Sequence, residues 1–383
     1  MKVLVVNTKY QLKGGEDSVV QNEVALLREA GVTTRVLEFS NYSNTLFKIL
    51  MLPFNVASFN KTSRMLRAYR PDVVHIHNLH FSASPAVLYA IKRHKIPVLM
   101  TLHNYRLLCP SATLFSRGQL FLSSVSKHFS WKTIKSGVYH DSKLLTLWMA
   151  MNIRLHHVLG TWKICQRFIV LNPHTRELFQ ESKLHGLTDR MVVKPNFCFA
   201  PPAQQKATGV YFLFVGRLSE EKGIAVMLKA FAATGFPLKI AGNGPLRDLV
   251  LDYCDKYPNI EYAGLLNREG LYDALNEATA LVFPSMWYET FGMVMIEAFA
   301  TGTPVIASKI GGAATIVDDG FNGLHFEAGN EADLSEKLQS WMRMPEEQKA
   351  VFQKNAVVTY NEKYTPQKNA SELLTIYNDL IYG

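Results

Sequence analysis

The sequence predicts an α/β protein with two Rossmann-like domains that face each other across a cleft. Three observations lead to this prediction: a length of 383 residues, an alternation of short apolar runs with helical stretches that starts twice, and a polar segment between the two series. A chain of this length is too long for one ordinary core and suits two domains of roughly 190 residues each.

The first series occupies residues 1–197, the predicted N-terminal domain. Its continuous apolar runs are typical of buried parallel strands: Lys2–Asn7, Thr33–Phe39, Asp72–Ile76, Val98–Leu102, Phe168–Leu171 and Met191–Lys194. Helices are predicted at Asp17–Ala30, which ends before Gly31, and at Ser84–His94. Residues 41–69 and 111–165 are less regular and rich in basic and aromatic side chains.

The second series occupies residues 208–365, the predicted C-terminal domain. Its strands are expected at Val210–Val215, Leu238–Ala241, Ile260–Tyr262, Ala280–Phe283 and Pro304–Ala307, each followed by a helical segment. The segment Asn196–Gly209, which contains two prolines and few apolar residues, is typical of an interdomain linker. Residues 366–383 are expected to form a terminal helix after Pro366.

The termini and the cysteines predict a cytoplasmic protein. The chain starts with a strand-like run rather than a signal peptide, and no uncharged apolar run reaches the ~18 residues of a transmembrane helix. Four scattered cysteines have neither metal-ligand spacing nor a disulfide pattern: Cys109, Cys165, Cys198 and Cys254. They are typical of buried thiols in a reducing compartment.

Charge is unevenly distributed along the chain. Residues 1–200 contain 26 Lys/Arg and 10 Asp/Glu, whereas residues 201–383 contain 15 and 22. A basic half suggests that one domain meets an anionic substrate or surface, and the inner face of a membrane is the favoured surface. The basic, aromatic segments 45–70 and 127–167 would then lie on the membrane interface, or alternatively they form ordinary helices with solvated charges. No nucleic-acid recognition motif is present, so a nucleic-acid partner is not expected.

Two glutamates stand in the very apolar stretch 283–306. Phe291–Thr301 is a predicted helix that ends at Gly302, so Glu289 lies in the loop before it and Glu297 within it. Open α/β sheets bind ligands at such strand-to-helix loops, and the two acids could hold different hydroxyl groups of one extended ligand. Alternatively, Glu289 is a plain loop residue and Glu297 pairs in a seam between helices.

The start of this helix offers backbone donors to an anion. The residues concerned are Phe291, Gly292, Met293 and Val294. Amides in the first turn have no partner inside the helix, and the helix dipole favours negative charge there.

A basic pair follows the first strand of the second half, in Gly-Arg-Leu-Ser-Glu-Glu-Lys-Gly. Gly216 allows a sharp turn, Arg217 emerges at the end of the strand, and Lys222 lies near the next helix. Two fixed cations there would clamp a diphosphate. The alternative is that both pair with Glu220 and Glu221 on the surface.

The string Glu-x-Phe-Gly-x-x-x-x-Glu at residues 289–297, followed by Ala-Phe-Ala-Thr-Gly-Thr-Pro-Val-Ile, resembles the signature of retaining glycosyltransferases of family 4. The spacing Gly-Arg-Leu-x-x-x-Lys-Gly also matches that family's donor-phosphate motif. The resemblance covers nearly the whole chain, and it implies that the terminal helix of residues 366–383 crosses back to the N-terminal domain. It implies the GT-B fold, a nucleoside-diphosphate sugar as donor, most simply a UDP- or GDP-sugar, and an acceptor that is a glycan or a lipid-linked sugar.

The resemblance also implies roles for residues outside these two motifs. Gly244, in Ala-Gly-Asn-Gly-Pro, matches a family turn, and Leu266 occupies the place where the family holds the nucleotide base. Gly14 and Gly15 match the family's glycine loop, which would contact a phosphate or the acceptor. His103 matches a strand-end histidine that contacts the donor sugar and the reaction centre.

Three features need separate interpretation. Asn104 follows His103 where the family commonly has Asp, and Thr315 stands where it usually has Glu, so the sugar preference is expected to be unusual. His75, His77 and His80 alternate along one strand, but we expect no supporting Asp or Glu ligand nearby and therefore no metal site there.

The implied reaction is a metal-independent hexose transfer with retention of configuration. Arg217, Lys222 and the helix amides would neutralise the departing diphosphate. Glu289 would hold sugar hydroxyls and Glu297 the ribose hydroxyls, while domain closure would exclude water. Two alternatives remain at this point: a GT-B sugar-nucleotide epimerase, and a non-catalytic partner subunit that binds a nucleotide.

Overall fold

The computed structural model of the protein describes residues 1–9, 15–41, 49–201 and 209–383. These residues form two compact units. One contains Met1–Leu114, Phe121–Asn196 and Pro366–Gly383, and the other contains Phe115–Leu120 and Phe197–Thr365. The short hairpin of β5 (Phe115–Ser116) and β6 (Gln119–Leu120), from within the predicted first domain, is thus grouped with the second unit.

The first unit is built on a parallel sheet of order β2-β1-β3-β4-β7-β8. Its strands are β1 (Lys2–Lys9), β2 (Thr33–Ser40), β3 (Val73–Ile76), β4 (Val98–Leu102), β7 (Arg167–Val170) and β8 (Met191–Val193). Its helices are α1 (Gly15–Glu29), α3 (Val56–Tyr69), α4 (Ala86–His94), α5 (Trp131–Lys135), α6 (Lys143–Val158), α7 (Pro173–Gln180) and α15 (Pro366–Tyr382), with short 3-10 turns at Thr161–Ile164 and His185–Arg190. Central strands are buried on both faces, which explains their continuous apolar sequences.

The second unit has a parallel sheet of order β11-β10-β9-β12-β13-β14. Its strands are β9 (Tyr211–Val215), β10 (Leu238–Ala241), β11 (Ile260–Gly264), β12 (Ala278–Phe283), β13 (Val305–Ser308) and β14 (Gly323–Phe326). Its helices are α8 (Ile224–Thr234), α9 (Arg247–Lys256), α10 (Arg268–Glu277), α11 (Met293–Ala300), α12 (Ala313–Ile316), α13 (Glu331–Arg343) and α14 (Glu346–Lys363), and a 3-10 turn covers Glu220–Lys222. In chain order this sheet reads 3-2-1-4-5-6, the Rossmann arrangement.

The strand order predicts where each unit binds ligands. In the second unit, β10 and β11 lie on one side of β9, whereas β12, β13 and β14 lie on its other side. The switch point therefore lies between β9 and β12. In the first unit the reversal lies between β1 and β3. Open parallel sheets bind ligands beyond the carboxyl ends of the strands at such a point.

Two segments differ from the sequence-based prediction. The strand β14 was missed because it is only four residues long and contains Gly323 and His325, which weaken the strand pattern. The stretch 41–69 contains the regular helix α3, whose start is capped by the Asn55 side chain accepting from the amides of Ala57 and Ser58.

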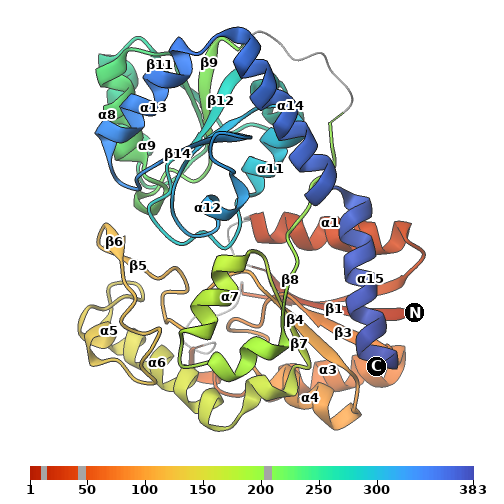
Figure 1. The fold of residues 1–383 in the computed structure, drawn as a ribbon. Helices are drawn as coiled ribbons and strands as arrows, with labels where there is room; N and C mark the ends of the chain where they lie inside the picture. Colours follow the sequence, from red (N-terminus) through yellow and green to blue (C-terminus); the bar gives the residue numbers. More distant parts are fainter. Residues whose placement is uncertain (10–14, 42–48, 202–208) are drawn as a thin grey trace. The chain divides into compact units, whose positions relative to one another are not determined.

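The terminal helix α15 belongs to the first unit and packs against α1 and β3 (Figure 1). Asn369 donates to the carbonyl of Pro195 at 2.8 Å, and the Tyr377 hydroxyl lies 2.8 Å from His75 Nδ1. The last helix therefore supplies polar groups to β3, through His75, and to the segment that follows β8. Within the described ranges of the chain, no helix is both long and apolar enough to cross a membrane.

Candidate functional site

The switch point of the second unit brings two loops together. One follows β9 and carries Gly216, Arg217 and Lys222; the other follows β12 and carries Glu289. Because β9 and β12 are adjacent parallel strands, their carboxyl ends lie at the same edge of the sheet. The residues predicted from two separate motifs are thus neighbours in the fold.

Lys222 and Glu289 form an ion pair across these loops. The carboxylate also accepts from the Ser285 hydroxyl at 2.9 Å, and the glutamate is buried. The Lys222 ammonium lies 5.5 Å from the centre of the Trp287 ring and 5.7 Å from that of Phe283. The alternative pairing of Lys222 with Glu220 or Glu221 is therefore not what the structure has.

Arg217 is in a different situation, because its side chain is 61% exposed. Its guanidinium lies 3.9 Å from Glu221 Oε1, which also accepts from the Ser219 hydroxyl at 2.6 Å. The surface pairing considered for Arg217 is thus present. An exposed contact of this length contributes little to stability, so the guanidinium can turn toward an anion at small cost.

Close backbone packing holds this edge of the sheet in place. A Cβ added to Gly223 would lie 1.9 Å from the Pro284 carbonyl oxygen, and the φ of Gly223 is +70°. A Cβ on Gly244 would lie 2.4 Å from the Leu218 carbonyl oxygen. Only glycine permits these approaches, which fix the loop bearing Lys222 against the loops after β12 and β10.

The helix α11 is shorter than predicted, running from Met293 to Ala300. Phe291 precedes it, and Gly292 is its N-cap residue with φ −148° and no side-chain cap. The amides of the first turn, which include Val294, lie at the end of the loop that carries Glu289. This helix start follows the loop that carries buried Glu289, the partner of Lys222, and these polar groups together favour a polar ligand.

Glu297 lies in the middle of α11. Burial raises the pKa of Glu297 to about 7, and the Arg268 guanidinium partly opposes this increase. The residue is thus a half-buried acid with a pKa near neutral rather than a member of a tight ion pair. Leu266 lies in the loop between β11 and α10, just before Arg268, and is partly exposed.

In the first unit, His103 follows β4 and stacks on His77 with ring centroids 5.2 Å apart. Its Nε2 lies 2.9 Å from His77 Nδ1. Burial and then the neighbouring His77 hold the pKa of His103 well below its usual value. His103 is therefore a neutral imidazole at physiological pH.

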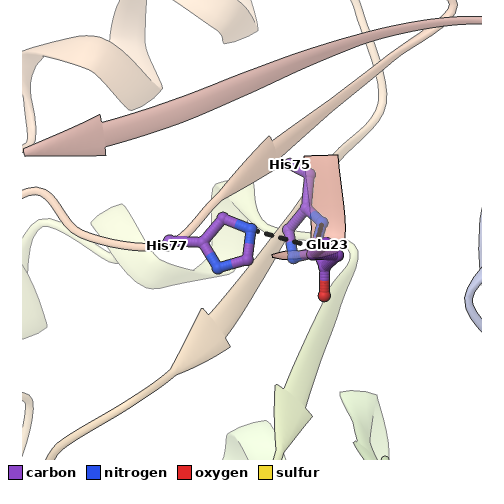
Figure 2. A group of neighbouring side chains, drawn as sticks. All are labelled: Glu23, His75 and His77. Carbon is purple, nitrogen blue, oxygen red and sulfur yellow. Dashed lines mark ion pairs between the residues drawn. The ribbon is translucent and has the colours of Figure 1, made fainter. Parts of the chain in front are cut away.

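The reason given for excluding a metal near His75 and His77 was wrong, because an acid does lie beside them. Glu23, from α1, places its Oε1 3.1 Å from His75 Nδ1 and 3.1 Å from His77 Nε2 (Figure 2). The three side chains could hold a metal ion by distance alone, since their donor atoms lie within 4.8 Å of one another. Buried Lys194, however, lies 3.7 Å from Glu23 Oε2 and already neutralises the carboxylate.

A pocket in the first unit opens beside His103. Its empty space, open mouth included, is about 700 Å³. Much of its wall is apolar, with Leu52, Leu79, Met149, Ile153 and Trp162 among the lining residues. Polar groups reach it as well: His80, Asn104, Arg106 and His156. Such a mixture suits a ligand with both hydroxyl groups and apolar surface.

One of the predicted site residues lies outside the described part of the chain. Gly14 lies in the segment 10–14, which is not among the described residues, and Gly15 is the first residue of α1. Next to them, burial and then Asp17 raise the pKa of Glu16 to about 8, against the opposing effects of Arg106 and Asn78.

Sequence reasoning did not single out Glu23, although a signal was present. On α1 the buried apolar positions Val20, Val24 and Leu27 recur at helical spacing, and Glu23 falls on the same face. An acid on the core-facing stripe of a helix requires a buried partner. Ser285 gave no comparable signal, because a serine in a loop is unremarkable in sequence.

Comparison with known proteins adds the following findings. The profile described as glycosyl transferases group 1 matches residues 200–379, and the profile of the glycosyl transferase 4-like domain matches residues 5–138. An uncharacterized glycosyltransferase of Methanocaldococcus jannaschii is 23% identical over 394 residues, covering 99% of each chain. A GDP-mannose-dependent alpha-mannosyltransferase of Corynebacterium glutamicum is 26% identical over 307 residues, covering 76% of this chain and 63% of that protein.

Among solved structures, Anabaena HepE in complex with UDP superposes with a TM-score of 0.71. The sequences are 17% identical, and the match covers 99% of this chain and 100% of that one. Two parallel-sheet α/β domains of this kind define the GT-B fold. The chain belongs to the group 1 glycosyltransferases of family 4.

Proposed function

We propose that the protein transfers a hexose from a nucleoside-diphosphate donor to an acceptor hydroxyl, with retention of configuration and without a metal ion. The observation that carries this proposal is the arrangement at the switch point of the second unit. Lys222 and Arg217 follow β9, while buried Glu289 and the start of α11 follow β12. Two cations, a helix start and a carboxylate at one edge suit a diphosphate joined to a sugar.

Of the two substrates, the donor is better supported than the acceptor. Arg217 and Lys222 would bind the diphosphate, Glu289 the sugar hydroxyls, and Glu297 the ribose hydroxyls of a UDP- or GDP-sugar. Gly216 and Gly244 would allow close backbone approach, and Leu266 would lie beside the base. Relatives support both bases, since the HepE structure contains UDP and the Corynebacterium glutamicum relative is named for GDP-mannose.

The chemical step follows from where charge develops. The bond between the anomeric carbon and the diphosphate oxygen breaks, the acceptor oxygen bonds to that carbon from the same face, and the acceptor proton passes to a diphosphate oxygen. Arg217 and Lys222 stabilise the negative charge on the departing diphosphate. Positioning of the two substrates supplies much of the remaining acceleration.

The pocket beside His103 is the proposed acceptor site. Its polar residues, His80, Arg106 and His156, would orient a sugar or phosphate group, and its apolar wall would cover a hydrocarbon portion. The inner face of α6 supplies Met149, Asn152, Ile153 and His156 to this wall. We therefore favour an amphiphilic acceptor, such as a lipid-linked sugar.

The outer face of α6 supports the same choice. Its exposed apolar residues are Leu144, Met151, Leu155 and Val158, with Leu159 directly after the helix. At helical spacing these positions form one stripe, opposite the buried residues of the helix. Exposed Lys143 and Arg154 lie on the same helix, and exposed Trp131 and Lys132 lie on neighbouring α5. An apolar stripe with basic residues suits the anionic inner face of a membrane.

The test is a binding and turnover screen of UDP-, GDP-, ADP- and dTDP-sugars with EDTA present. One nucleotide should raise the melting temperature, Arg217→Ala should abolish that shift, and Glu289→Ala should abolish slow donor hydrolysis. Transfer to short-chain lipid-linked sugars should give a product with the anomeric configuration of the donor, as read by NMR. Binding that needs a divalent metal, or an inverted product, would contradict the proposal. Nucleotide binding without any turnover would favour the non-catalytic subunit instead.

A further inference from the structure

Three buried side chains of the first unit converge on one point between α1 and β3. Glu23 lies on α1, His75 lies on β3, and His77 directly follows β3. Glu23 Oε1 lies 3.1 Å from His75 Nδ1 and 3.1 Å from His77 Nε2 (Figure 2). None of these side chains is more than 5% exposed. Their polar atoms therefore need partners inside the protein.

Hydrogen bonds do not account for this convergence. Among the residues that the structure describes, neither Glu23 Oε1 nor His77 Nε2 has a hydrogen-bonding partner. A buried polar atom without a partner is costly, and a bound ion is one of the few ways to compensate it. The distances also suit an ion, because two ligands of a tetrahedral zinc ion with bonds of ~2.1 Å lie about 3.4 Å apart. All three ligand atoms lie within 4.8 Å of one another.

The ring nitrogens that face away from Glu23 are held by other side chains. His75 Nε2 lies 2.7 Å from the Thr101 hydroxyl, and His77 Nδ1 lies 2.9 Å from His103 Nε2. A histidine that binds a metal through one nitrogen almost always uses the other in a hydrogen bond, which fixes the direction of the ring. Both histidines thus have the two-sided surroundings of metal ligands.

We propose that Glu23, His75 and His77 bind a structural zinc ion through Oε1, Nδ1 and Nε2, respectively. Two imidazole nitrogens and a carboxylate oxygen form a donor set that suits zinc. The Tyr377 hydroxyl, 2.8 Å from His75 Nδ1, is an oxygen within reach of the fourth position. When the ion binds Nδ1, this hydroxyl exchanges its contact with the nitrogen for one with the ion. The ion then ties α1 to β3 and to the terminal helix α15.

Lys194 opposes a second cation here and so limits how tightly the ion binds. Its Nζ lies 3.7 Å from Glu23 Oε2, the carboxylate oxygen that the ion does not use. The carboxylate thus lies between two positive charges, the ammonium group at Oε2 and the ion at Oε1. Because like charges repel strongly in a low-dielectric interior, removal of the Lys194 charge should strengthen metal binding.

The zinc site is separate from the proposed donor site. Its ligands belong to the first unit, whereas Arg217, Lys222 and Glu289 belong to the second. His77 also lines the pocket proposed for the acceptor, so the ion stabilises one wall of that pocket. The two proposals fail separately, because zinc content does not depend on whether the protein transfers a sugar.

Elemental analysis by mass spectrometry tests the proposal on the full chain, produced in zinc-containing medium and purified in metal-free buffer. We expect about one zinc ion per chain in the wild type and less than about 0.2 in Glu23→Gln and His75→Asn. His80→Asn is the matched control, because His80 is a buried histidine of the same segment outside the cluster, and it should retain zinc. Zn²⁺ alone should raise the melting temperature of chelator-treated wild type by about 5 °C or more, but not that of Glu23→Gln.

Lys194→Met gives a result that misfolding cannot imitate. It removes the competing charge, so zinc should bind at least about tenfold more tightly in a competition with a chromophoric chelator. X-ray absorption at the zinc edge should show nitrogen and oxygen ligands without sulfur. A wild type that contains no zinc and is not stabilised by added Zn²⁺ would overturn the proposal. Zinc retained in Glu23→Gln, sulfur ligands, or no tighter binding by Lys194→Met would also overturn it, because the ion would then lie elsewhere.

Discussion

Lys222, in the loop after β9, and Glu289, in the loop after β12, form an ion pair at the point where the sheet of the second unit changes direction. The two residues are 67 positions apart in the chain, and adjacent parallel strands bring them together. In the absence of a donor, each neutralises the other in partly apolar surroundings formed by Trp287 and Phe283. Under our proposal, a donor sugar and its diphosphate would become additional partners of the same two residues.

Removal of Lys222 separates the structural from the catalytic contribution of this pair. Lys222→Met leaves the buried carboxylate of Glu289 without its cation, so we expect a loss of about 1–3 kcal/mol in the free energy of unfolding. The transfer rate should fall by about 100-fold or more, because a charge on the departing diphosphate loses its partner. Urea unfolding and a transfer assay measure the two effects.

The double variant Lys222→Met/Glu289→Gln is the control for that experiment. It removes both charges, so stability should largely return while activity stays lost. If the double variant is as unstable as the single one, the ion pair does not account for the stability of these loops.

The raised pKa of Glu297 predicts that the stability of the fold and the affinity for nucleotide depend on pH in opposite directions. Burial raises the pKa of Glu297 to about 7, whereas the ordinary pKa of this carboxyl, which applies in the unfolded chain, is 4.5. Ionisation of Glu297 therefore destabilises the fold progressively as pH rises from 4.5 to about 7. The ionised form is the one that would accept hydrogen bonds from ribose hydroxyls. Nucleotide affinity should therefore increase about tenfold between pH 6 and 8, with release of a proton on binding.

Calorimetry in two buffers of different ionisation enthalpy measures both the affinity and the released proton. Glu297→Gln removes the titration and should flatten the affinity profile while binding stays at a weaker, constant level. An unchanged pH profile in Glu297→Gln would show that another group controls it.

The close packing at Gly223 predicts that adding a single methyl group there lowers stability and weakens nucleotide binding. In Gly223→Ala the new Cβ would lie 1.9 Å from the Pro284 carbonyl oxygen, so the loops after β9 and β12 must separate. We expect a loss of more than about 2 kcal/mol in the free energy of unfolding and weaker nucleotide binding. Chemical denaturation and nucleotide titration provide the measurements.

Gly235 is a matched control, because its φ of +71° is nearly the same but no atom lies within 4 Å of an added Cβ. Gly235→Ala should therefore show only the backbone strain of about 1 kcal/mol, with nucleotide binding unchanged. Equal effects at the two positions would mean that the contact with Pro284 is unimportant.

The exposed face of α6 predicts membrane association that depends on anionic lipid. Leu155→Glu and Val158→Glu place negative charge on the apolar stripe and should remove most binding to vesicles that contain anionic lipid, as measured by co-sedimentation. Higher salt should weaken the wild-type association, because basic residues contribute about 1 kcal/mol each near such a surface.

Val351→Glu provides the comparison, because Val351 is also an exposed valine but lies on α14 in the second unit. It should leave vesicle binding unchanged. Equal binding by wild type and the α6 variants, or binding to neutral vesicles alone, would contradict a membrane role for this face.

Much of the architecture follows from local sequence pattern. Continuous apolar runs such as Val98–Leu102 predict buried parallel strands, and the structure has a strand with the same bounds. Gly223, with a φ of +70°, marks a turn because glycine tolerates a backbone conformation that other residues rarely adopt. These features depend on neighbours in the chain, which is why sequence alone reveals them.

Partnerships between distant residues were decided only by the tertiary structure. Lys222 stands next to Glu220 and Glu221 in sequence, yet it pairs with Glu289 because strand order places β9 beside β12. Glu23 meets His77 for the same reason: α1 packs on the sheet that contains β3, and no local pattern encodes that register. Sequence by itself therefore determined the helices, the strands and the residue types available for chemistry. The packing of strands and helices determined which of these residues become partners.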